Sequence, residues 1–445
     1  MTLNLLKRVP HVLDASDPGT GKTRAHIEGF LHVRKLRKGA CLIICPKSLM
    51  DPAWGQDIRR FAPQLSVSLA FAENREKAFA VEADVYITNT DATKWLVKQP
   101  KKFFNKFSMV IIDEIQYFKH HTAQRSSAMA KIAKYFPYRR GLGATLTANT
   151  VCDIWHPMYI LDGGERLGRI FSGFRAAVSI PVQVGPRAEH IKWEDRPGAE
   201  EAVVALIKDM SVRHEFADVM KEVPGNKQYF MTYALTPKQY KVYREMEDFT
   251  VVKLKDETIS AVNAAALRTK LLQIASGAVY AGESVYEVVD TGRYELVLDL
   301  IEARKHTVVF FNWVHQKEQL VKLAKARHID FEVIDGTVPV KKRNEIVEFF
   351  QNGFYQALFL QPKTGAHGLT LTRGTSTIWC SPIYEADMLK QGLHRIYRGG
   401  QTQATETILI EAQGTVERLV YERLMSKAGR MQNFLDILKE LRNER

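Results

Sequence analysis

A glycine-rich string near the start of the chain, DPGTGKT at residues 17–23, has the composition of a phosphate-binding loop. Its glycines allow a tight turn in which backbone N–H groups point inward at phosphate oxygens. Lys22 would reach the β- and γ-phosphates of a nucleotide, and the Thr23 hydroxyl would bind Mg²⁺. The alternative is an accidental match between an apolar run and a helix.

An acidic pair, Asp113-Glu114, directly follows the apolar run at residues 109–112. Such a run predicts a buried strand, so both carboxylates would leave the sheet at its carboxyl end, where ligands bind in open α/β sheets. Asp113 could then hold Mg²⁺ through water, and Glu114 could polarise the attacking water. Taken alone, an acidic pair after a strand can equally cap a helix.

Two arginines three residues apart, Arg395 and Arg398, lie in the string QGLHRIYRGGQ at residues 391–401. On a helix or a tight turn this spacing makes them project from one face. The guanidinium fork stays charged and matches the oxygens of a γ-phosphate. In isolation they could also be two solvated side chains of a basic protein.

Together, a phosphate cradle, a carboxylate pair and distant arginines are the parts of a two-lobed ATP motor. The predicted catalytic residues are Lys22, Asp113, Glu114, Arg395 and Arg398. The predicted nucleotide-binding residues are Gly19, Thr20, Gly21, Lys22, Thr23 and Gln391. Thr23 and Asp113 are the predicted metal ligands, and the predicted cofactors are ATP and Mg²⁺.

These residues need parallel strands and helices to position them. In the first 160 residues, short apolar runs at 12–13, 41–45, 84–88 and 109–112 alternate with helix-like segments such as 23–36. The alternation returns after about residue 290, with predicted strands at 307–311, 331–334, 357–360, 377–380 and 407–410. Buried runs separated by helices indicate parallel sheets covered on both faces. The predicted fold class is α/β, with two RecA-like parallel-sheet lobes and helical insertions.

The predicted organisation has five parts: lobe 1 with residues 1–165, a helical insertion on lobe 1 with 166–224, a helical segment leading into lobe 2 with 225–290, lobe 2 with 291–415, and a C-terminal helical brace with 416–445. Helical periodicity at 200–209, 237–255 and 259–275 supports the two helical segments.

The composition favours a polyanion as a partner. The chain has 445 residues and a formal net charge of +13, which for a protein of a reducing compartment points to nucleic acid, although a preference for solubility is the simpler explanation. No apolar run approaches the length of a membrane span, and the start of the chain lacks a secretory signal, so we expect a cytoplasmic protein without membrane contact.

The order of further motifs resembles the Swi/Snf-type branch of superfamily-2 helicases and translocases over nearly the whole chain. In lobe 1 the resembling segments are 17–23 (motif I), 45–49 with Trp54 (motif Ia), 87–89 (motif Ib), 113–116 (the DEAH-like box) and 142–149 (motif III). In lobe 2 they are 308–313 (motif IV), 364–372 (motif V) and 391–401 (motif VI).

By this resemblance both arginines line the ATP cleft, with Arg398 as the arginine finger. DNA would be contacted mainly through its phosphates by motifs Ia, Ib, IV and V. The implied DNA-binding residues are Pro46, Lys47, Ser48, Thr88, Asn89, Asn312, Trp313, Thr364 and Gly365. The aromatic string 310–313 could stack on a base or pack in the core.

The chain also departs from the family pattern. In motif III, Leu146 replaces a proline, Gly143-Ala144 replaces threonine-glycine, and Thr145 is kept. In motif VI, His394 replaces an aspartate and Tyr397 a histidine. The family's adenine-recognition segment has no counterpart before the phosphate loop.

The resemblance implies a minimal motor of the kind that tailed phages encode for replication and recombination, which would act in the bacterial host cell. We expect an ATP-dependent DNA translocase or helicase that unwinds or remodels branched DNA such as forks and junctions. A duplex translocase that displaces bound proteins without separating strands is one alternative. A nucleic-acid-binding module with an inactive ATPase is another, against which the intact Lys22, Asp113, Glu114 and Arg398 argue.

Overall fold

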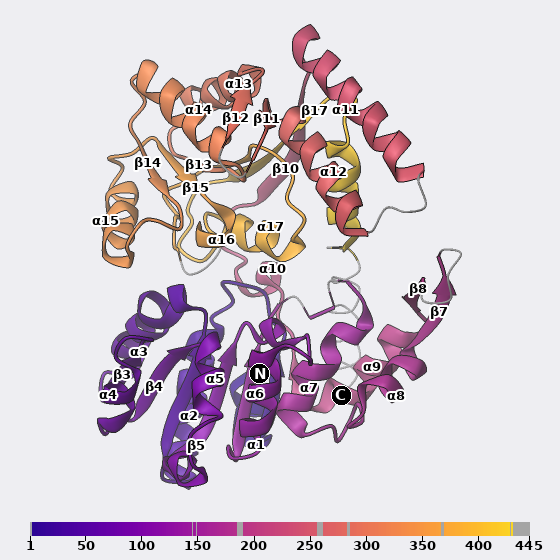
Figure 1. Cartoon of the computed structure of the whole chain (residues 1–445). Helices are drawn as coiled ribbons and strands as arrows, with labels where there is room; N and C mark the ends of the chain where they lie inside the picture. Colours follow the sequence, from indigo (N-terminus) through magenta and orange to yellow (C-terminus); the bar gives the residue numbers. More distant parts are fainter. Residues whose placement is uncertain are drawn as a thin grey trace. The chain divides into compact units, whose positions relative to one another are not determined.

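The computed structural model describes residues 2–427 and 429, apart from residues 145, 148, 185–189, 256–260, 283–284 and 366–368; the side chains of residues 250–265 and 365 also lie outside the description. The chain divides into two compact units: it passes from the first to the second between Met220 and Lys221, and Lys427 is assigned to the first unit again (Figure 1). Each unit is built on a parallel sheet of its own.

The first unit contains a seven-stranded sheet in the order β3-β4-β2-β5-β6-β1-β9, with all neighbouring strands parallel. The strands are β1 (His11–Asp14), β2 (Ala40–Cys45), β3 (Val67–Ala70), β4 (Val85–Asn89), β5 (Phe107–Asp113), β6 (Tyr138–Leu142) and β9 (Ser211–Val212). The longer helices are α1 (Thr2–Arg8), α2 (Lys22–Leu36), α6 (Gln124–Ala133), α7 (Trp155–Asp162), α8 (Phe171–Val178) and α9 (Ala199–Ile207). The shorter ones are α3 (Gln56–Phe61), α4 (Arg75–Ala80), α5 (Thr93–Leu96) and α10 (Phe216–Val219).

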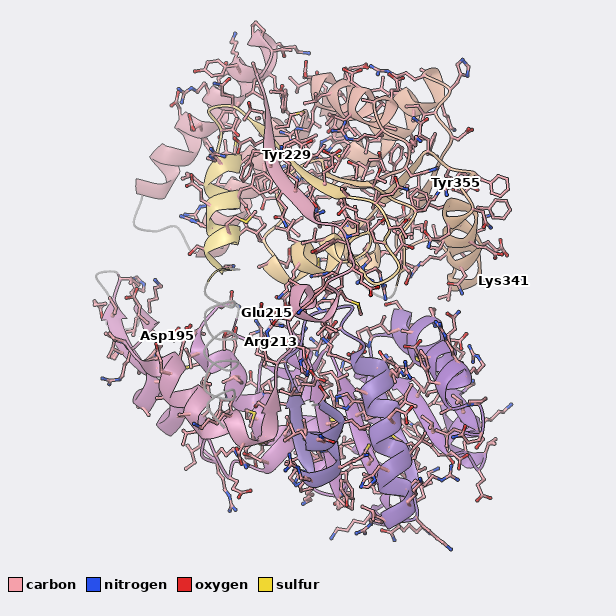
Figure 2. The ribbon with its side chains drawn as sticks, turned by 180° about the vertical axis from the view of Figure 1, so that it is seen from behind. Asp195, Arg213, Glu215, Tyr229, Lys341 and Tyr355 are labelled. Carbon is pink, nitrogen blue, oxygen red and sulfur yellow. The ribbon has the colours of Figure 1, made fainter. Side chains whose placement is uncertain are left out.

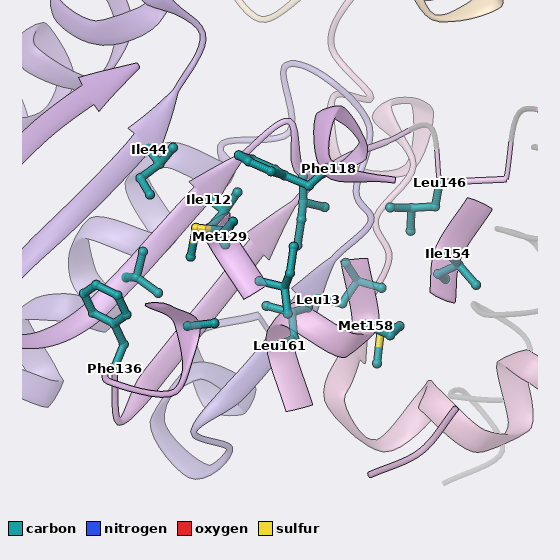
Figure 3. Close-up of a cluster of buried hydrophobic side chains, with 14 of the residues drawn as sticks. Leu13, Ile44, Ile112, Phe118, Met129, Phe136, Leu146, Ile154, Met158 and Leu161 are labelled. Atoms are coloured by element: carbon teal, nitrogen blue, oxygen red, sulfur yellow. The ribbon is translucent and has the colours of Figure 1, made fainter. Parts of the chain in front are cut away.

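The central strands of this sheet are buried on both faces because both faces are apolar. Along β2, Leu42 and Ile44 pack into one hydrophobic cluster, whereas Ile43 and Cys45 pack into another, since successive side chains of a strand point to opposite faces. Figure 3 shows the first cluster, where Ile44 and Ile112 of the sheet pack with side chains of α6 and α7. Helices α2 and α3 supply the second cluster.

The second unit contains a six-stranded parallel sheet in the order β10-β17-β16-β13-β15-β14. The strands are β10 (Asn226–Tyr233), β13 (Thr307–Phe310), β14 (Phe331–Ile334), β15 (Ala357–Leu360), β16 (Ser376–Trp379) and β17 (Thr405–Ala412). The helices are α11 (Pro237–Lys255), α12 (Ala261–Ala275), α13 (Gly292–Glu302), α14 (Val314–Ala326), α15 (Val340–Gln351), α16 (Pro362–Gly365) and α17 (Ala386–Leu393). A short antiparallel pair, β11 (Ala278–Tyr280) and β12 (Tyr286–Val288), follows α12.

The predicted fold class, α/β with two parallel-sheet lobes, is confirmed. Every strand that the apolar runs predict is present, and β14 and β15 have the predicted bounds. Phe310 and Phe311 are core residues of the second unit, as is Trp379, which stacks on Phe310 with 4.2 Å between ring centroids. The aromatic string 310–313 therefore packs in the core through its first two members.

The prediction that residues 166–224 form a helical insertion is wrong in part. This segment includes an antiparallel hairpin, β7 (Ser179–Gln183) and β8 (Ile191–Asp195), and ends in β9, which pairs with β1 at the edge of the first sheet. The hairpin is fastened by Asp195 (labelled in Figure 2), whose carboxylate accepts hydrogen bonds from the Thr150 hydroxyl at 2.6 Å and the Val151 N–H at 3.1 Å. The segment thus combines helices with a separate two-stranded hairpin, and only its strand β9 joins the first unit's sheet.

Two further strands lack the apolar run from which a buried strand is predicted. The segment 225–290 was expected to be helical, but it opens with β10, an edge strand whose mostly polar string NKQYFMTY pairs with β17 over eight residues. Strand β6 carries Arg139 and Arg140, and a buried arginine is not an apolar signal. Arg140 is accommodated because its guanidinium donates to the backbone oxygens of Leu6 and Val9, which also fastens α1 to the sheet.

Only the first part of the predicted C-terminal brace can be described. Residues 417–427 are helical, and the remainder up to 445 lies outside the described residues apart from Gly429. In the part of the chain that the structure covers, no helix has both the length and the apolar character needed to cross a membrane.

Candidate active site

The glycine-rich string forms a loop between β1 and α2 with an open face. Gly19 and Gly21 have φ of 81° and 82°, a conformation that favours glycine, and a side chain at Gly21 would meet no atom within 4 Å. Gly21 is also the N-cap of α2, and no side chain caps this helix end. The Lys22 ammonium donates to the backbone oxygens of Ser16 and Asp17. The loop can therefore hold a phosphate. It combines glycines with positive φ, a helix N-terminus without a side-chain cap and a lysine that points into the loop.

The loop is held from behind by the residues that follow β9. The backbone of Asp17 donates to the His214 oxygen at 2.9 Å, and the backbone of His214 donates to the Ser16 hydroxyl at 3.0 Å. The buried guanidinium of Arg213 (labelled in Figure 2) forms an ion pair with the Asp17 carboxylate at 2.8 Å. The Phe216 N–H donates to the same carboxylate at 3.0 Å. The loop therefore keeps its shape through a segment about 200 residues further along the chain.

The strand register brings the phosphate loop and the acidic pair to one edge of the sheet. Asp14, the last residue of β1, pairs with Leu142 of β6, and Leu142 pairs with Asp113 at the end of β5. The Asp14 backbone oxygen also accepts from the N–H of Gly143, which follows β6. The Lys22 charge contributes to the low pKa of Asp14 and opposes the rise in the pKa of Asp113, so it lies close to both carboxylates. Lys22 and Asp113 thus lie close together, and Thr23 follows Lys22 in α2.

The Asp113 carboxylate is fixed by two donors. Its Oδ2 accepts a hydrogen bond from the indole Nε1 of Trp54 at 2.8 Å, and its Oδ1 accepts from the Glu114 N–H at 3.1 Å. Burial, and next the neighbouring Glu114 carboxylate, raise the pKa of Asp113 to about 6. A carboxylate oxygen held this way suits a hard cation such as Mg²⁺. The positive charge of the cation would offset both the burial and the repulsion from Glu114.

Glu114 leaves the strand in a strained conformation. Its φ is 55° and its ψ 54°, values that a residue with a side chain rarely adopts. Its carboxylate accepts a hydrogen bond from the Gln116 side chain. The Gln116 side-chain oxygen also lies close to Gly143, so a larger residue at 143 would require the Gln116 side chain to shift. Strain of this kind is found where a side chain must be aimed.

The second departure in motif III is a core residue. Leu146 is buried and belongs to the hydrophobic cluster of the first unit (Figure 3). The proline that the family has at this position is therefore replaced by a side chain that adds apolar contact. Thr145, which the sequence suggested as a link between ATP state and DNA grip, lies outside the described residues.

The predicted DNA-binding residues of the first unit differ in accessibility. Lys47 is exposed, Ser48 is partly exposed and Pro46 is buried. Thr88 is fully buried, and its hydroxyl donates to the Ala70 oxygen at 2.8 Å, so its prediction as a DNA contact is wrong. Asn89 is partly exposed, and its side-chain oxygen accepts from Arg75. Lys47 and Ser48 are the better candidates.

In the second unit the two arginines share one acceptor. The guanidinium groups of Arg395 and Arg398 both donate to the Leu369 backbone oxygen, at 3.0 and 3.3 Å, from the turn that follows α17. Arg395 is buried and Arg398 is partly exposed. Gln391 is buried in the preceding helix. The partly exposed Arg398 is therefore better placed than Arg395 to reach a ligand.

The two departures in motif VI, His394 and Tyr397, contact each other. The rings of His394 and Tyr397 stack with 6.0 Å between centroids, and the His394 Nδ1 lies 3.1 Å from the Tyr397 oxygen. Gly392 allows α17 to approach the sheet, since a side chain there would lie 2.5 Å from the Trp379 ring. These residues set the position of the turn that carries both arginines.

The predicted DNA contacts of the second unit follow β13 and β15. The side-chain N–H groups of Asn312 donate hydrogen bonds to oxygens of Ser381 and the backbone oxygen of Pro382. Asn312 therefore holds the end of the strand, and its side chain has no donor left for a phosphate. Trp313 is partly exposed, and the Thr364 hydroxyl donates weakly to Gln361. Gly365 ends α16, and residues 366–368 of motif V lie outside the described residues.

Comparison with known proteins identifies the family. The profile described as SNF2-related domain matches residues 8–277, more than half of the chain. The chain belongs to the SNF2-related family. A second profile, described as Helicase conserved C-terminal domain, matches residues 292–400 of this SNF2-family chain. The family and the enzyme class that the motifs predicted, a helicase-type NTP hydrolase, are confirmed.

Relatives of this SNF2-family chain include both short and long proteins. Protein p41 of Acyrthosiphon pisum secondary endosymbiont phage 1 is 24% identical, over 95% of this chain and 93% of p41. YwqA of Bacillus subtilis, whose name describes an ATP-dependent helicase/translocase, is 26% identical over 93% of this chain, which spans only 45% of YwqA. Among solved structures, the Sulfolobus solfataricus SWI2/SNF2 ATPase core in complex with dsDNA is 21% identical, with 98% of this chain and 92% of that chain covered and a TM-score of 0.44.

Two site residues were missed by the sequence reasoning. Arg213 lies in a segment predicted only as part of a helical insertion, and nothing in its local sequence links it to the phosphate loop. Trp54 was noted only as part of motif Ia, although its indole contacts the carboxylate of the acidic pair. A lone tryptophan in an apolar context normally predicts a core residue, so its polar partner is visible only in the fold.

Proposed function

We propose that this chain is an ATP-dependent DNA translocase or helicase that unwinds or remodels branched DNA, such as forks and junctions. The observation that supports an active motor most strongly is the edge of the first sheet. There the open loop with Lys22 and the carboxylate of Asp113 follow strands of one continuous register. A chain with an inactive ATPase would have no need to maintain this arrangement.

The residues present fit ATP and Mg²⁺. The loop offers open space at Gly21, the N-terminus of α2 and the Lys22 ammonium for phosphate oxygens, and Thr23 and Asp113 supply oxygen ligands for Mg²⁺. When bound, ATP–Mg²⁺ supplies the phosphoanhydride bond and neutralises charge at the transferred phosphate.

Each residue of the chain would have a distinct role. Lys22 holds the phosphates, and Glu114 orients and polarises the attacking water while Gln116 holds its carboxylate. We further propose that Arg398 acts as the arginine finger in hydrolysis, since it is the more accessible of the two arginines. The two units would then grip DNA alternately as the nucleotide state changes.

DNA is the proposed partner for three reasons. The formal net charge of +13 suits a polyanion, and the exposed Lys47 lies beside the ATPase edge, directly after β2. The name of the relative YwqA describes a helicase/translocase. Contacts through phosphates would give weak sequence preference and strong salt dependence.

The experiment is ATPase activity measured at fixed salt with single-stranded, duplex, forked and four-way DNA, and with RNA. The proposal predicts stimulation by DNA, strongest with forked or four-way substrates, together with strand displacement on them. Equal stimulation by blunt duplex without strand displacement would favour the alternative, a duplex translocase that displaces bound proteins. The variant Glu114→Gln should remove turnover, whereas Lys94→Ala, a change at an exposed lysine of α5, should not.

A further inference from the structure

Trp54 is a core residue with one polar atom. Its side chain is fully buried in the hydrophobic cluster that also contains side chains of α2 and β2. An indole N–H in such surroundings needs an acceptor, because leaving it unpaired costs about 1–3 kcal/mol. The acceptor is the Oδ2 atom of Asp113, 2.8 Å away.

The segment that carries Trp54 begins at the predicted DNA surface. After β2, a single 3₁₀ turn (Lys47–Leu49) is followed at once by a π-helical turn (Met50–Gly55). A π-helical turn is rare and occurs often at functional sites. Here it places Trp54 inside the protein, seven residues after the exposed Lys47.

The same segment is tied to the helix that follows it by side-chain contacts. Asp51 forms an ion pair with Arg59 of α3 at 2.7 Å, across the end of the π-helical turn. The Asp51 carboxylate folds back so closely over Gly55 that a side chain at 55 would collide with it. Two consecutive helical turns thus join Lys47 to Trp54 directly, so a displacement at Lys47 has a short path to the indole.

The contact has a defined effect on Asp113. The terminal torsion of an aspartate is soft, so its two oxygens are aimed by their donors. One donor is the backbone of Glu114, which belongs to the same strand end, and the other is Trp54. The tryptophan is thus the donor that another segment of the chain can move.

We propose that Trp54 is a positioning residue that aims the Asp113 carboxylate and couples it to DNA contact at Lys47 and Ser48. This inference rests on the proposed function, because the coupling presumes that Lys47 and Ser48 meet DNA. DNA bound at the turn after β2 fixes the position of the indole, and the indole fixes the orientation of the Asp113 carboxylate. The rate of nucleotide hydrolysis then depends on whether DNA is bound. The chemistry recognised at the outer end is a phosphate of the DNA backbone.

The test compares Trp54→Phe with a matched control, Trp95→Phe. Phenylalanine keeps an aromatic ring but removes the N–H donor. Trp95 is a partly exposed tryptophan of the same unit that stacks on Phe79, at a centroid distance of 5.4 Å. A second variant with benzothienylalanine at position 54 replaces the N–H by sulfur in a ring of the same size, so it separates the hydrogen bond from packing if Trp54→Phe lowers the melting temperature.

Two measurements are made on each protein. The first is binding of N-methylanthraniloyl-ADP by fluorescence as Mg²⁺ is titrated without DNA. Loss of a hydrogen bond to a charged group should raise the Mg²⁺ concentration for half-maximal binding by about tenfold. The second is the ratio of ATPase rates with and without duplex DNA, which should fall by about tenfold in both Trp54 variants while the affinity for DNA stays within about twofold.

The outcomes separate this inference from the function on which it rests. Wild-type Mg²⁺ dependence and an unchanged DNA stimulation ratio in both Trp54 variants would overturn it. A changed Mg²⁺ dependence with an unchanged ratio would overturn the coupling. If the wild-type protein itself shows no DNA stimulation, the proposed function fails, and the Mg²⁺ titration alone then decides whether Trp54 positions Asp113.

Discussion

Asp14 shows how much a single buried residue does beneath the phosphate loop. Its carboxylate accepts hydrogen bonds from the Ser16 N–H at 3.0 Å and the His26 ring at 3.2 Å, and its backbone oxygen accepts from Gly143. Burial alone would raise its pKa, but the hydrogen bond from His26, the charge of the same ring and the Lys22 ammonium together lower the pKa to about 2. The ionised carboxylate therefore stabilises the fold.

The first prediction concerns the pH dependence of this stability. A depressed carboxyl pKa contributes stability that is complete above the unfolded value, near 3.8, and is lost as the pH falls towards 2. Asp14→Asn should lower the free energy of unfolding of the first unit by about 2 kcal/mol at pH 7. Urea unfolding from pH 7 to pH 2 should show the difference between variant and wild type shrinking below pH 4. A difference independent of pH would contradict this account.

The two arginines of motif VI should respond differently to truncation. Arg395 is buried, so Arg395→Ala should cost about 2 kcal/mol of stability, because a charged hydrogen bond to Leu369 is lost. Arg398→Ala should leave the melting temperature nearly unchanged and reduce the ATPase rate by roughly 10³-fold or more. Calorimetry and phosphate release measure the two effects. Equal losses of stability in both variants would show that Arg398 is structural.

At the residue level, part of the site could be predicted from local chemistry. Lys22 and Asp113 were found because glycines and an apolar strand flank them, and the structure brings them together. Thr88 was misassigned because a motif match gives no information on which way a side chain points, and this one is buried. The Trp54 contact could not be predicted, since it joins residues 59 positions apart.

At the level of elements, the small strand β9 has a large effect. It pairs with β1, and the residues after it bind the phosphate loop through both backbone and side chains. The same stretch continues through α10 to the boundary between the units at residues 220 and 221. The phosphate loop and the start of the connection are therefore one hydrogen-bonded structure within the first unit.

The ion pair in this structure gives the next prediction. Arg213→Met keeps much of the side-chain volume but leaves the Asp17 carboxylate without its guanidinium, and breaking one side of a buried pair costs about 3–5 kcal/mol. The variant should melt at a lower temperature and bind N-methylanthraniloyl-ADP more weakly, as measured by calorimetry and fluorescence. The double variant with Asp17→Asn should recover part of the stability. Full additivity of the two changes would show that the pair does not couple.

The strands could be predicted from the sequence where they are apolar. Strands such as β2, β5 and β13 are continuous hydrophobic runs, and buried parallel strands need such runs. Strand β6 could not be found this way, because its arginine is satisfied by backbone oxygens of α1 and the residue that follows it. Strand β10 lies at the sheet edge and is half exposed, so its sequence resembles that of a polar segment.

At the level of the whole molecule, the chain is a member of the SNF2-related family built on two parallel-sheet units. The first unit carries the phosphate loop and the acidic pair, and the second carries the arginines. A motor account requires that both units contribute to one ATPase cycle and that DNA controls it. The fold of either unit alone establishes neither requirement, so both have to be tested on the full chain.

The most direct test is the steady-state ATPase rate of the full chain with and without forked DNA, for the wild type, Glu114→Gln, Lys22→Ala and the control Lys94→Ala. The account predicts that DNA raises the wild-type and control rates by more than about tenfold, and that the two site variants stay at background although both remain folded. DNA-stimulated turnover in Glu114→Gln or Lys22→Ala, or a wild-type rate that DNA does not change, would contradict it.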